Sequence, residues 1–110
     1  MRTILLGDII AVARVLFLAP SDHKISLLGT MIQQADAAHD YQKRLGKPHP
    51  VWGNGSLMAR ANCEPQAPEP SASDSAYLQA LHLVIGGIIS HKRGPENTGP
   101  RRRSMPKAGG

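Results

Sequence analysis

The sequence predicts an all-α protein: a compact bundle of three to four helices over residues 1–90, followed by a disordered basic tail over residues 91–110. Apolar residues recur every three or four positions across residues 9–45 and again across residues 77–89, which is the period of an α-helix. The chain has one Trp, one Phe and two Tyr, too few for the aromatic-rich alternating strands of a β-sandwich. A length of 110 residues suits a single domain.

The first helix is expected over residues 9–18. Asp8 precedes it as the N-cap, because its carboxylate can accept from backbone N–H groups one turn later, and Pro20 discourages continuation. The segment is strongly apolar, but Asp8 and Arg14 interrupt it, and it is shorter than the ~20 residues of a membrane-spanning helix. We therefore expect a buried core helix and no membrane span.

The second helix is expected over residues 23–45, with Ser21 and Asp22 as its cap. One side of this helix is apolar, whereas Asp36, Asp40, Lys43 and Arg44 project to the other, solvent side. Gly46 ends the helix in the usual C-terminal manner. In the bundle that we predict, this long helix and the fourth helix sandwich the first.

Two shorter elements and a linker follow. A helix over residues 57–62 is capped by Asn54 or Ser56, and the Pro-rich residues 64–73 form an extended linker. The fourth helix is expected over residues 75–89, with Ser73 and Asp74 as its cap. Gly86 and Gly87 weaken this helix but permit close approach of a neighbouring helix.

The most distinctive segment is the loop over residues 47–56. Its prolines and glycines favour a rigid turn that presents four candidate ligand-binding or partner-binding residues: His49, Trp52, Asn54 and Ser56. The alternative, which we favour, is that Trp52 plugs the helical core and the glycines only turn the chain, because Trp is usually heavily buried. Under that interpretation Ser56 is a helix cap.

No set of residues indicates catalysis, a cofactor or a metal site. Asp36 and His39 are spaced three apart on a helix, but helical di-metal sites need two such pairs with further carboxylates. Ser56 lies in neither a phosphate-binding loop nor a nucleophile elbow. Cys63 is the only cysteine, so the chain can form no internal disulfide, and we expect an inert thiol in a reducing, cytoplasmic setting.

The net charge of +5 comes entirely from the tail, because residues 1–91 carry seven basic and seven acidic side chains. Six cations lie beyond them, alongside one acid: Lys92, Arg93, Arg101, Arg102, Arg103 and Lys107. They form a candidate polyanion-binding tail that would hold nucleic-acid phosphates without sequence specificity. The competing and favoured interpretation is a solubilising tail with no binding role.

The segment from His49 to Ala59, read as HPVWGNGSLMA, resembles a family of small uncharacterised helical proteins from Rhodobacter-like alphaproteobacteria. The opening Leu5-Leu6-Gly7-Asp8 and the Pro68-Glu69-Pro70 of the linker are similar as well, so the likeness covers about residues 1–89. This resemblance implies a bacterial cytoplasmic helical protein and implies no particular activity.

Two function classes remain open from the sequence. The wide apolar helix surfaces and the lack of a catalytic set favour a small non-enzymatic protein–protein interaction module, with an unidentified partner or by self-association. The alternative is a nucleic-acid-associated accessory protein that binds phosphates through its tail only.

Overall fold

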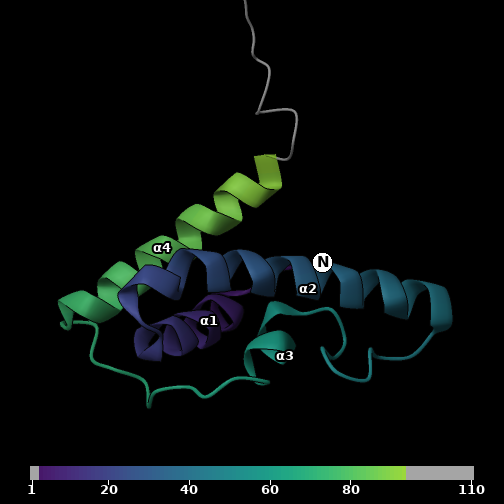
Figure 1. The fold of residues 1–110 in the computed structure, drawn as a ribbon, viewed down its shortest axis with the longest axis horizontal. Helices are drawn as coiled ribbons and strands as arrows, with labels where there is room; N and C mark the ends of the chain where they lie inside the picture. Colours follow the sequence, from purple (N-terminus) through teal and green to yellow (C-terminus); the bar gives the residue numbers. More distant parts are fainter. Residues whose placement is uncertain (1–2, 94–110) are drawn as a thin grey trace, which may run out of the picture.

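The computed structural model describes residues 3–93 and confirms the all-α class. The chain forms α1 (Leu6–Leu18), a 3-10 turn η1 (Ser21–His23), α2 (Lys24–Leu45), a short α3 (Leu57–Ala61) and α4 (Ser75–Arg93) (Figure 1). Over these described residues there is no β-strand, only an isolated bridge between His49 and Gly53. No helix within residues 3–93 is both long enough and apolar enough to cross a bilayer.

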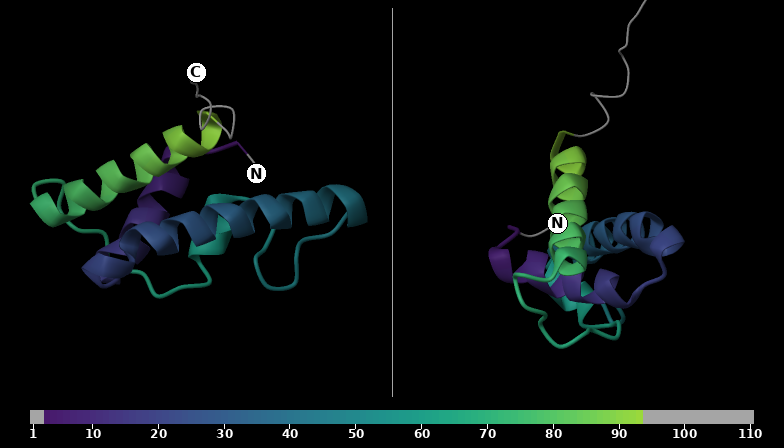
Figure 2. Two further views of the ribbon diagram at one scale, coloured as in Figure 1. Left: turned by 45° about the horizontal axis from the view of Figure 1, so that its top comes forward. Right: turned by 90° about the vertical axis from the view of Figure 1, so that its left-hand side faces the viewer.

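The core is built around α1. This helix packs most extensively against α4 and α3, and less extensively against α2, so the expected sandwich of α1 between α2 and α4 is only part of the arrangement (Figure 2). The largest fully buried side chains come from all four α-helices: Val12, Leu16, Met31, Leu57 and Val84. Since α1 contacts every other helix, its wide apolar arc is used on several sides at once.

The start of α1 differs from the prediction. The helix begins at Leu6, and Asp8 lies in its first turn instead of serving as the N-cap. The Asp8 carboxylate, 5% exposed, accepts from the backbone N–H of Leu5 at 2.7 Å through Oδ2. A carboxylate in the first turn that bonds back to the residue before the helix is one half of a capping box. The prediction of Asp8 as the N-cap is therefore wrong, because Leu5 is the N-cap and the helix begins three residues earlier than expected.

The predicted caps of α2 are confirmed at one end only. Residues 21–23 form the 3-10 turn, α2 begins at Lys24, and no side chain caps its first turn, so Ser21 and Asp22 are not its caps. The Lys24 ammonium instead donates to the carbonyl oxygen of Leu16 near the end of α1, which also accepts from the backbone N–H of Ala19. Gly46 ends α2 as predicted, with a left-handed φ of 72° and its N–H bonded to the Gln42 carbonyl.

The linker before α4 is tied to α1. The Arg14 side chain donates through Nε to the Ala67 carbonyl at 2.6 Å, and the Ala67 N–H donates to the Arg14 carbonyl at 3.2 Å. At the start of α4, Asp74 caps the helix as predicted, accepting from the N–H groups of Ala76 and Tyr77. The extended segment is thus held at both ends.

α4 continues to Arg93, four residues beyond the predicted end. The sequence places His91, Lys92 and Arg93 in the tail, whereas in the structure they belong to the helix. Cations in the last turn of a helix interact favourably with its dipole, and this favours the extension. The expected tail, including Arg101, Arg102, Arg103 and Lys107, otherwise lies outside the described residues.

Candidate functional site

The predicted loop residues come together in one folded unit, but their polar groups are turned inward. His49 and Gly53 pair through two backbone hydrogen bonds, and His49 Nδ1 accepts from the N–H groups of Val51 and Trp52 at 3.1 and 3.0 Å. Asn54 Oδ1 accepts from the Ser56 N–H, and Ser56 Oγ caps α3 by accepting from the Ala59 N–H. The cap prediction for Ser56 is confirmed.

Trp52 lies outside the buried core. Its half-buried ring stacks on the His49 imidazole with centroids 4.6 Å apart and an interplanar angle of 6°, and His49 in turn meets the Tyr41 ring edge-on. The interpretation of Trp52 as a plug of the helical core is therefore wrong. The ring is part of an aromatic stack that attaches the loop to the C-terminal half of α2.

Two further contacts lock this loop onto the helices. Gly55 has φ +93°, and a Cβ placed there would lie 2.6 Å from His39 Cα, so the loop backbone rests directly on α2. The Met58 N–H at the start of α3 donates to Asp8 Oδ1 at 2.8 Å, which links α3 to α1. These contacts make the loop a structural element, in which His49 Nδ1, Asn54 Oδ1 and Ser56 Oγ already accept backbone N–H groups.

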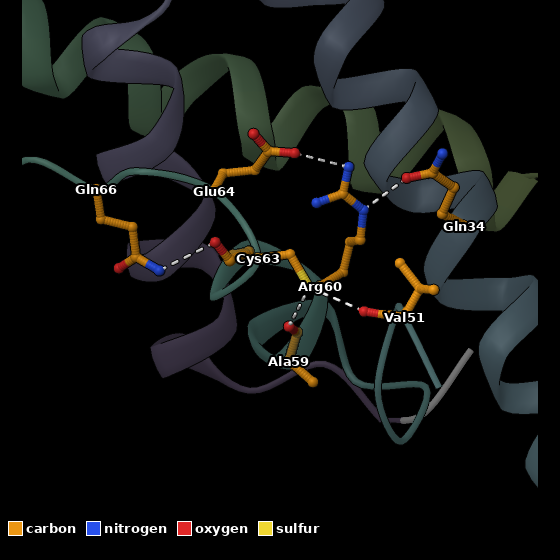
Figure 3. A network of polar contacts seen from close by, with 8 residues as sticks. Gln34, Val51, Ala59, Arg60, Cys63, Glu64 and Gln66 are labelled. Carbon is orange, nitrogen blue, oxygen red and sulfur yellow. Dashed lines mark hydrogen bonds and ion pairs between the residues drawn. The ribbon is translucent and has the colours of Figure 1, made fainter. Parts of the chain in front are cut away.

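Arg60 forms a buried polar centre that sequence analysis missed (Figure 3). Its Nε donates to Gln34 Oε1 at 2.6 Å, and its Nη2 lies 2.9 Å from Glu64 Oε2. Nη1 is buried without a hydrogen-bond partner among the described residues, which is the usual position for an ordered water. The only sequence signal was the spacing of four between Arg60 in α3 and Glu64 just beyond the end of that helix.

Cys63 lies at the end of the same network. Its Sγ is within hydrogen-bond distance of the carbonyl oxygens of Val51 (3.2 Å) and Ala59 (3.6 Å), as Figure 3 shows. Both contacts are to backbone carbonyl oxygens, and neither is to a base or a cation of the kind that activates a thiol. This arrangement gives the residue no activating partner.

Asp36 and His39, which are spaced three apart in the sequence, contact different parts of the fold. His39 is pressed against Gly55, whereas Asp36 Oδ2 lies 2.8 Å from His91 Nε2 and joins α2 to α4. Asp36 was expected on the solvent side and is instead half-buried at this contact. Among the side chains of residues 3–93, no three His, Cys, Asp or Glu gather in a way that would hold a metal ion.

A groove between α2 and α4 has room for another molecule, with a volume of about 590 Å³. We call it the α2–α4 groove. Its α2 side is Ile25, Leu28, Gly29, Ile32 and Gln33, and its α4 side is His82, Leu83, Gly86, Gly87, Ser90 and His91. Figure 1 shows α4 rising away from α2 toward its C-terminal end.

The walls of the groove are largely apolar, and glycine leaves parts of them without side chains. Ile25 is 72% exposed, although its side chain is fully aliphatic. Gly29 and Gly86 lie in the middle of their helices, and a Cβ added at either position would meet no atom within 4 Å. Gly87 is different, because a Cβ there would lie 2.6 Å from Leu28 Cδ2. Gly87 thus permits the close approach of α2 that was predicted, whereas Gly29 and Gly86 leave bare backbone facing open space.

The charge along the groove is uneven. α4 contains no acidic residue and carries His91, Lys92 and Arg93 in its last turn. The one carboxylate on α2 beside this end is that of Asp36, which is engaged by His91. The sequence then continues into the remaining tail cations. The C-terminal end of the groove is therefore the cationic end.

Tyr77 lies on the opposite, buried side of α4, edge-on to Phe17. Burial raises the pKa of its phenol, with a further increase from the Glu69 carboxylate, which Arg14 partly offsets. The neutral phenol is the form that the core accommodates.

A family model described as a domain of unknown function (DUF7742) matches residues 2–88 of the chain. The match covers all of α1, η1, α2 and α3 and most of α4. Among curated proteins and among solved structures, none shows significant similarity to this chain.

Proposed function

Because the chain belongs to the DUF7742 family, a domain of unknown function, we propose a function from its own surface: a small, non-enzymatic protein–protein interaction module. The binding surface is the α2–α4 groove. The observation that carries this proposal is an apolar groove between two helices whose walls are built with glycine where the fold itself does not require glycine.

Gly29 and Gly86 lower the stability of the helices that contain them. Glycine in a helix interior costs about 1 kcal/mol relative to alanine. Neither position has a neighbour that would collide with a methyl group. A partner that lies close against both helix backbones gives these glycines a use, because only glycine leaves the backbone uncovered.

The exposed aliphatic side chain of Ile25 supports the same surface. Burying it against a partner is favourable by about 25 cal/mol per Å² of apolar area removed from water. Leu28 and Ile32 lie below it in the core, so a bound partner would extend an existing apolar cluster.

The non-enzymatic part of the proposal rests on how the polar side chains are used. Ser56 Oγ caps a helix, His49 Nδ1 accepts two backbone N–H groups, and the Cys63 thiol lies against carbonyl oxygens. None of these groups faces another in a nucleophile–base arrangement of the kind that acyl transfer requires. We further place the protein in the bacterial cytoplasm, where a lone cysteine is kept reduced.

The experiment compares the proteins that three tagged full-length forms of this chain capture from a cell lysate. The three forms are the wild type, Gly86→Leu and Ala37→Leu. Leucine at position 86 fills the α2–α4 groove, whereas Ala37 is an exposed α2 residue that does not line it. Quantitative mass spectrometry should find a protein that wild type and Ala37→Leu retain and Gly86→Leu loses. Equal retention by all three would remove the groove as the binding surface, and no retained protein for any would contradict an interaction module.

A second candidate function is favoured by the position of the charge. The excess of +5 lies wholly in residues 92–110, and this supports the alternative proposal of a nucleic-acid accessory protein that binds phosphates through this segment. Full-length protein should then bind a DNA or RNA oligonucleotide with an affinity that falls as salt rises. A chain ending at Arg93 should lose most of that affinity, and equal binding by both forms would contradict this function.

A further inference from the structure

We propose that the α2–α4 groove binds an acidic amphipathic helix of another protein, one that combines an aliphatic face with a row of Glu or Asp along its flank. The proposal rests on the proposed function as an interaction module and specifies the chemical class of the partner. It is carried by the shape of the groove, its apolar lining and the sign of the charge at its C-terminal end.

The shape favours a helix over an extended strand. Both walls are α-helices whose backbone N–H and C=O groups are bonded within the helix, so the groove offers no edge to which a strand could add. Helices pack at interaxial distances of 8–10 Å, and the shortest distances need small residues at the contact. Gly29 and Gly86 provide such residues on opposite walls.

The lining specifies the face of the helix that enters. Leu28, Ile32 and Leu83 form the apolar lining, and exposed Ile25 extends it at the rim. An aliphatic face with residues at positions i, i+3, i+4 and i+7 is the usual complement of such a surface. Gln33, His82 and Ser90 supply polar groups at the margin, where a partner's flank would remain in contact with water.

The charge at the C-terminal end of α4 indicates which side chains should flank the aliphatic face of the partner helix. α4 has no acid along its whole length, and its last turn is His91-Lys92-Arg93. Asp36, the carboxylate nearest this end, is already held by His91. A partner helix with acidic residues toward this end gains electrostatic attraction, whereas a basic helix is repelled.

Charge disfavours the two occupants that the chain itself could supply. A second copy would offer the exposed stripe of Leu78, Ile85 and Ile89 on α4, but that helix is cationic and carries no acid. The chain's own residues 94–110 have four basic residues against Glu96 and a single large apolar side chain, Met105. Both therefore have the wrong charge for the cationic end of the groove.

The test measures binding of three labelled, hydrocarbon-stapled peptides to full-length protein by fluorescence anisotropy at low salt. Each peptide has about 14 residues, which as a helix spans about 21 Å. The first has a leucine face and a glutamate flank, the second has the same face with a lysine flank, and the third has the glutamate flank with serine in place of leucine. We expect the first to bind at least about tenfold more tightly than the second, and the third not to bind.

Two pairs of variants locate the binding. Gly86→Leu should abolish binding of the glutamate peptide, and Ala37→Leu should leave it unchanged. Lys92→Glu should weaken it about threefold or more at low salt, with a smaller effect at high salt because ions screen exposed charges. Lys43→Glu changes the net charge equally but lies in the last turn of α2, outside the groove, so it should leave binding unchanged.

Several results would overturn the proposal. Equal affinity for the glutamate and lysine peptides would remove the charge assignment while leaving the groove as a docking surface. A dimer in light scattering that Gly86→Leu dissociates would assign the groove to a second copy. Tighter binding of an oligonucleotide than of the glutamate peptide, with no effect of Gly86→Leu, would assign the cations to nucleic acid. Failure of all three peptides, with groove-dependent capture intact, would reject a helical partner but keep the interaction module.

Discussion

Asp8 is the side chain through which the first turns of two helices are joined. One carboxylate oxygen accepts from Leu5 before α1, and the other accepts from Met58 in the first turn of α3. The helices are distant in sequence, so this single buried carboxylate sets how α3 and the loop before it sit on α1. Both acceptors are occupied by N–H groups that would otherwise be unpaired at a helix start.

Replacing Asp8 with alanine should lower the free energy of unfolding by about 2 kcal/mol, because it leaves two backbone N–H groups without acceptors. Urea denaturation followed by circular dichroism measures this change. Asp40→Ala, at an exposed position on α2, is the matched control and should change stability by less than about 0.5 kcal/mol. Equal effects of the two substitutions would contradict the joining role of Asp8.

Gly55 and Gly46 both have positive φ, but their surroundings differ. Gly46 has open space where a Cβ would be, whereas a Cβ at Gly55 would collide with the backbone of His39. Gly46→Ala should therefore cost about 1–2 kcal/mol from the left-handed conformation alone. Gly55→Ala should cost clearly more, because α2 and the loop must separate. Similar urea midpoints for the two variants would show that the loop does not rest on α2 as described.

Trp52 gives a measurable distinction between an aromatic stack and a core position. The stack on His49 predicts that Trp52→Ala costs about 1–2 kcal/mol, from the lost ring contact and partial burial. Truncation of a fully buried Trp would cost about 3–5 kcal/mol. A loss in that higher range, measured by thermal unfolding, would mean that the ring supports the whole fold.

Among the helices, α4 is the one whose sides have contrasting roles. Tyr77, Ala80, Val84 and Ile88 face the core, and the groove side carries glycine. This contrast separates two adjacent residues, Gly86 and Gly87: the first faces open space and the second faces Leu28. The same residue type therefore serves opposite purposes one position apart.

Gly86→Ala should stabilise the folded protein by about 1 kcal/mol, because alanine has the higher helix propensity and meets no neighbour. Gly87→Ala should stabilise less or destabilise, since Leu28 must move. Chemical denaturation of both variants tests the pair. If Gly87→Ala were the more stable of the two, the assignment of Gly87 to the α2 contact would be wrong.

For the molecule as a whole, the stability resides in the residues packed on α1. Every member of the buried core lies between residues 11 and 88, and the burial of Tyr77 within it raises the pKa of that phenol. Since the folded pKa exceeds the unfolded one, the stabilising effect is fully present below pH ~10 and is lost as pH rises above the unfolded pKa. Tyr77→Phe should reduce this alkaline loss, as a denaturation series between pH 8 and pH 11 would show.

A chain that ends at Arg93 should have the same free energy of unfolding as the full-length protein, within about 0.5 kcal/mol, because within residues 3–93 no core residue lies beyond Ile88. This truncation keeps the contact between His91 and Asp36. A large loss of stability would indicate that residues 94–110 support the fold, and it would contradict the expectation that residues 3–93 are stable without them.

The helices and several of their ends were predictable from the sequence alone. Apolar spacing identifies α2 and α4, and Gly46, Ser56 and Asp74 mark helix boundaries where the structure has them. These features depend on hydrogen bonds and side-chain periods within a few residues, so local sequence is enough to specify them. The end of α4 was missed because the apolar pattern ends at Ile89, whereas the contact of His91 with Asp36 in the last turn lies across the fold.

The α2–α4 groove, the burial of Arg60 and the place of Trp52 were decided only when the helices came together. Each depends on the distance and angle between segments far apart in the chain: α2 against α4 for the groove, Gln34 against Arg60, and Tyr41 against His49. Local propensity does not contain those distances, because they result from how apolar faces pack around α1. The sequence therefore specified the helices, and their packing created the surface on which a partner would bind.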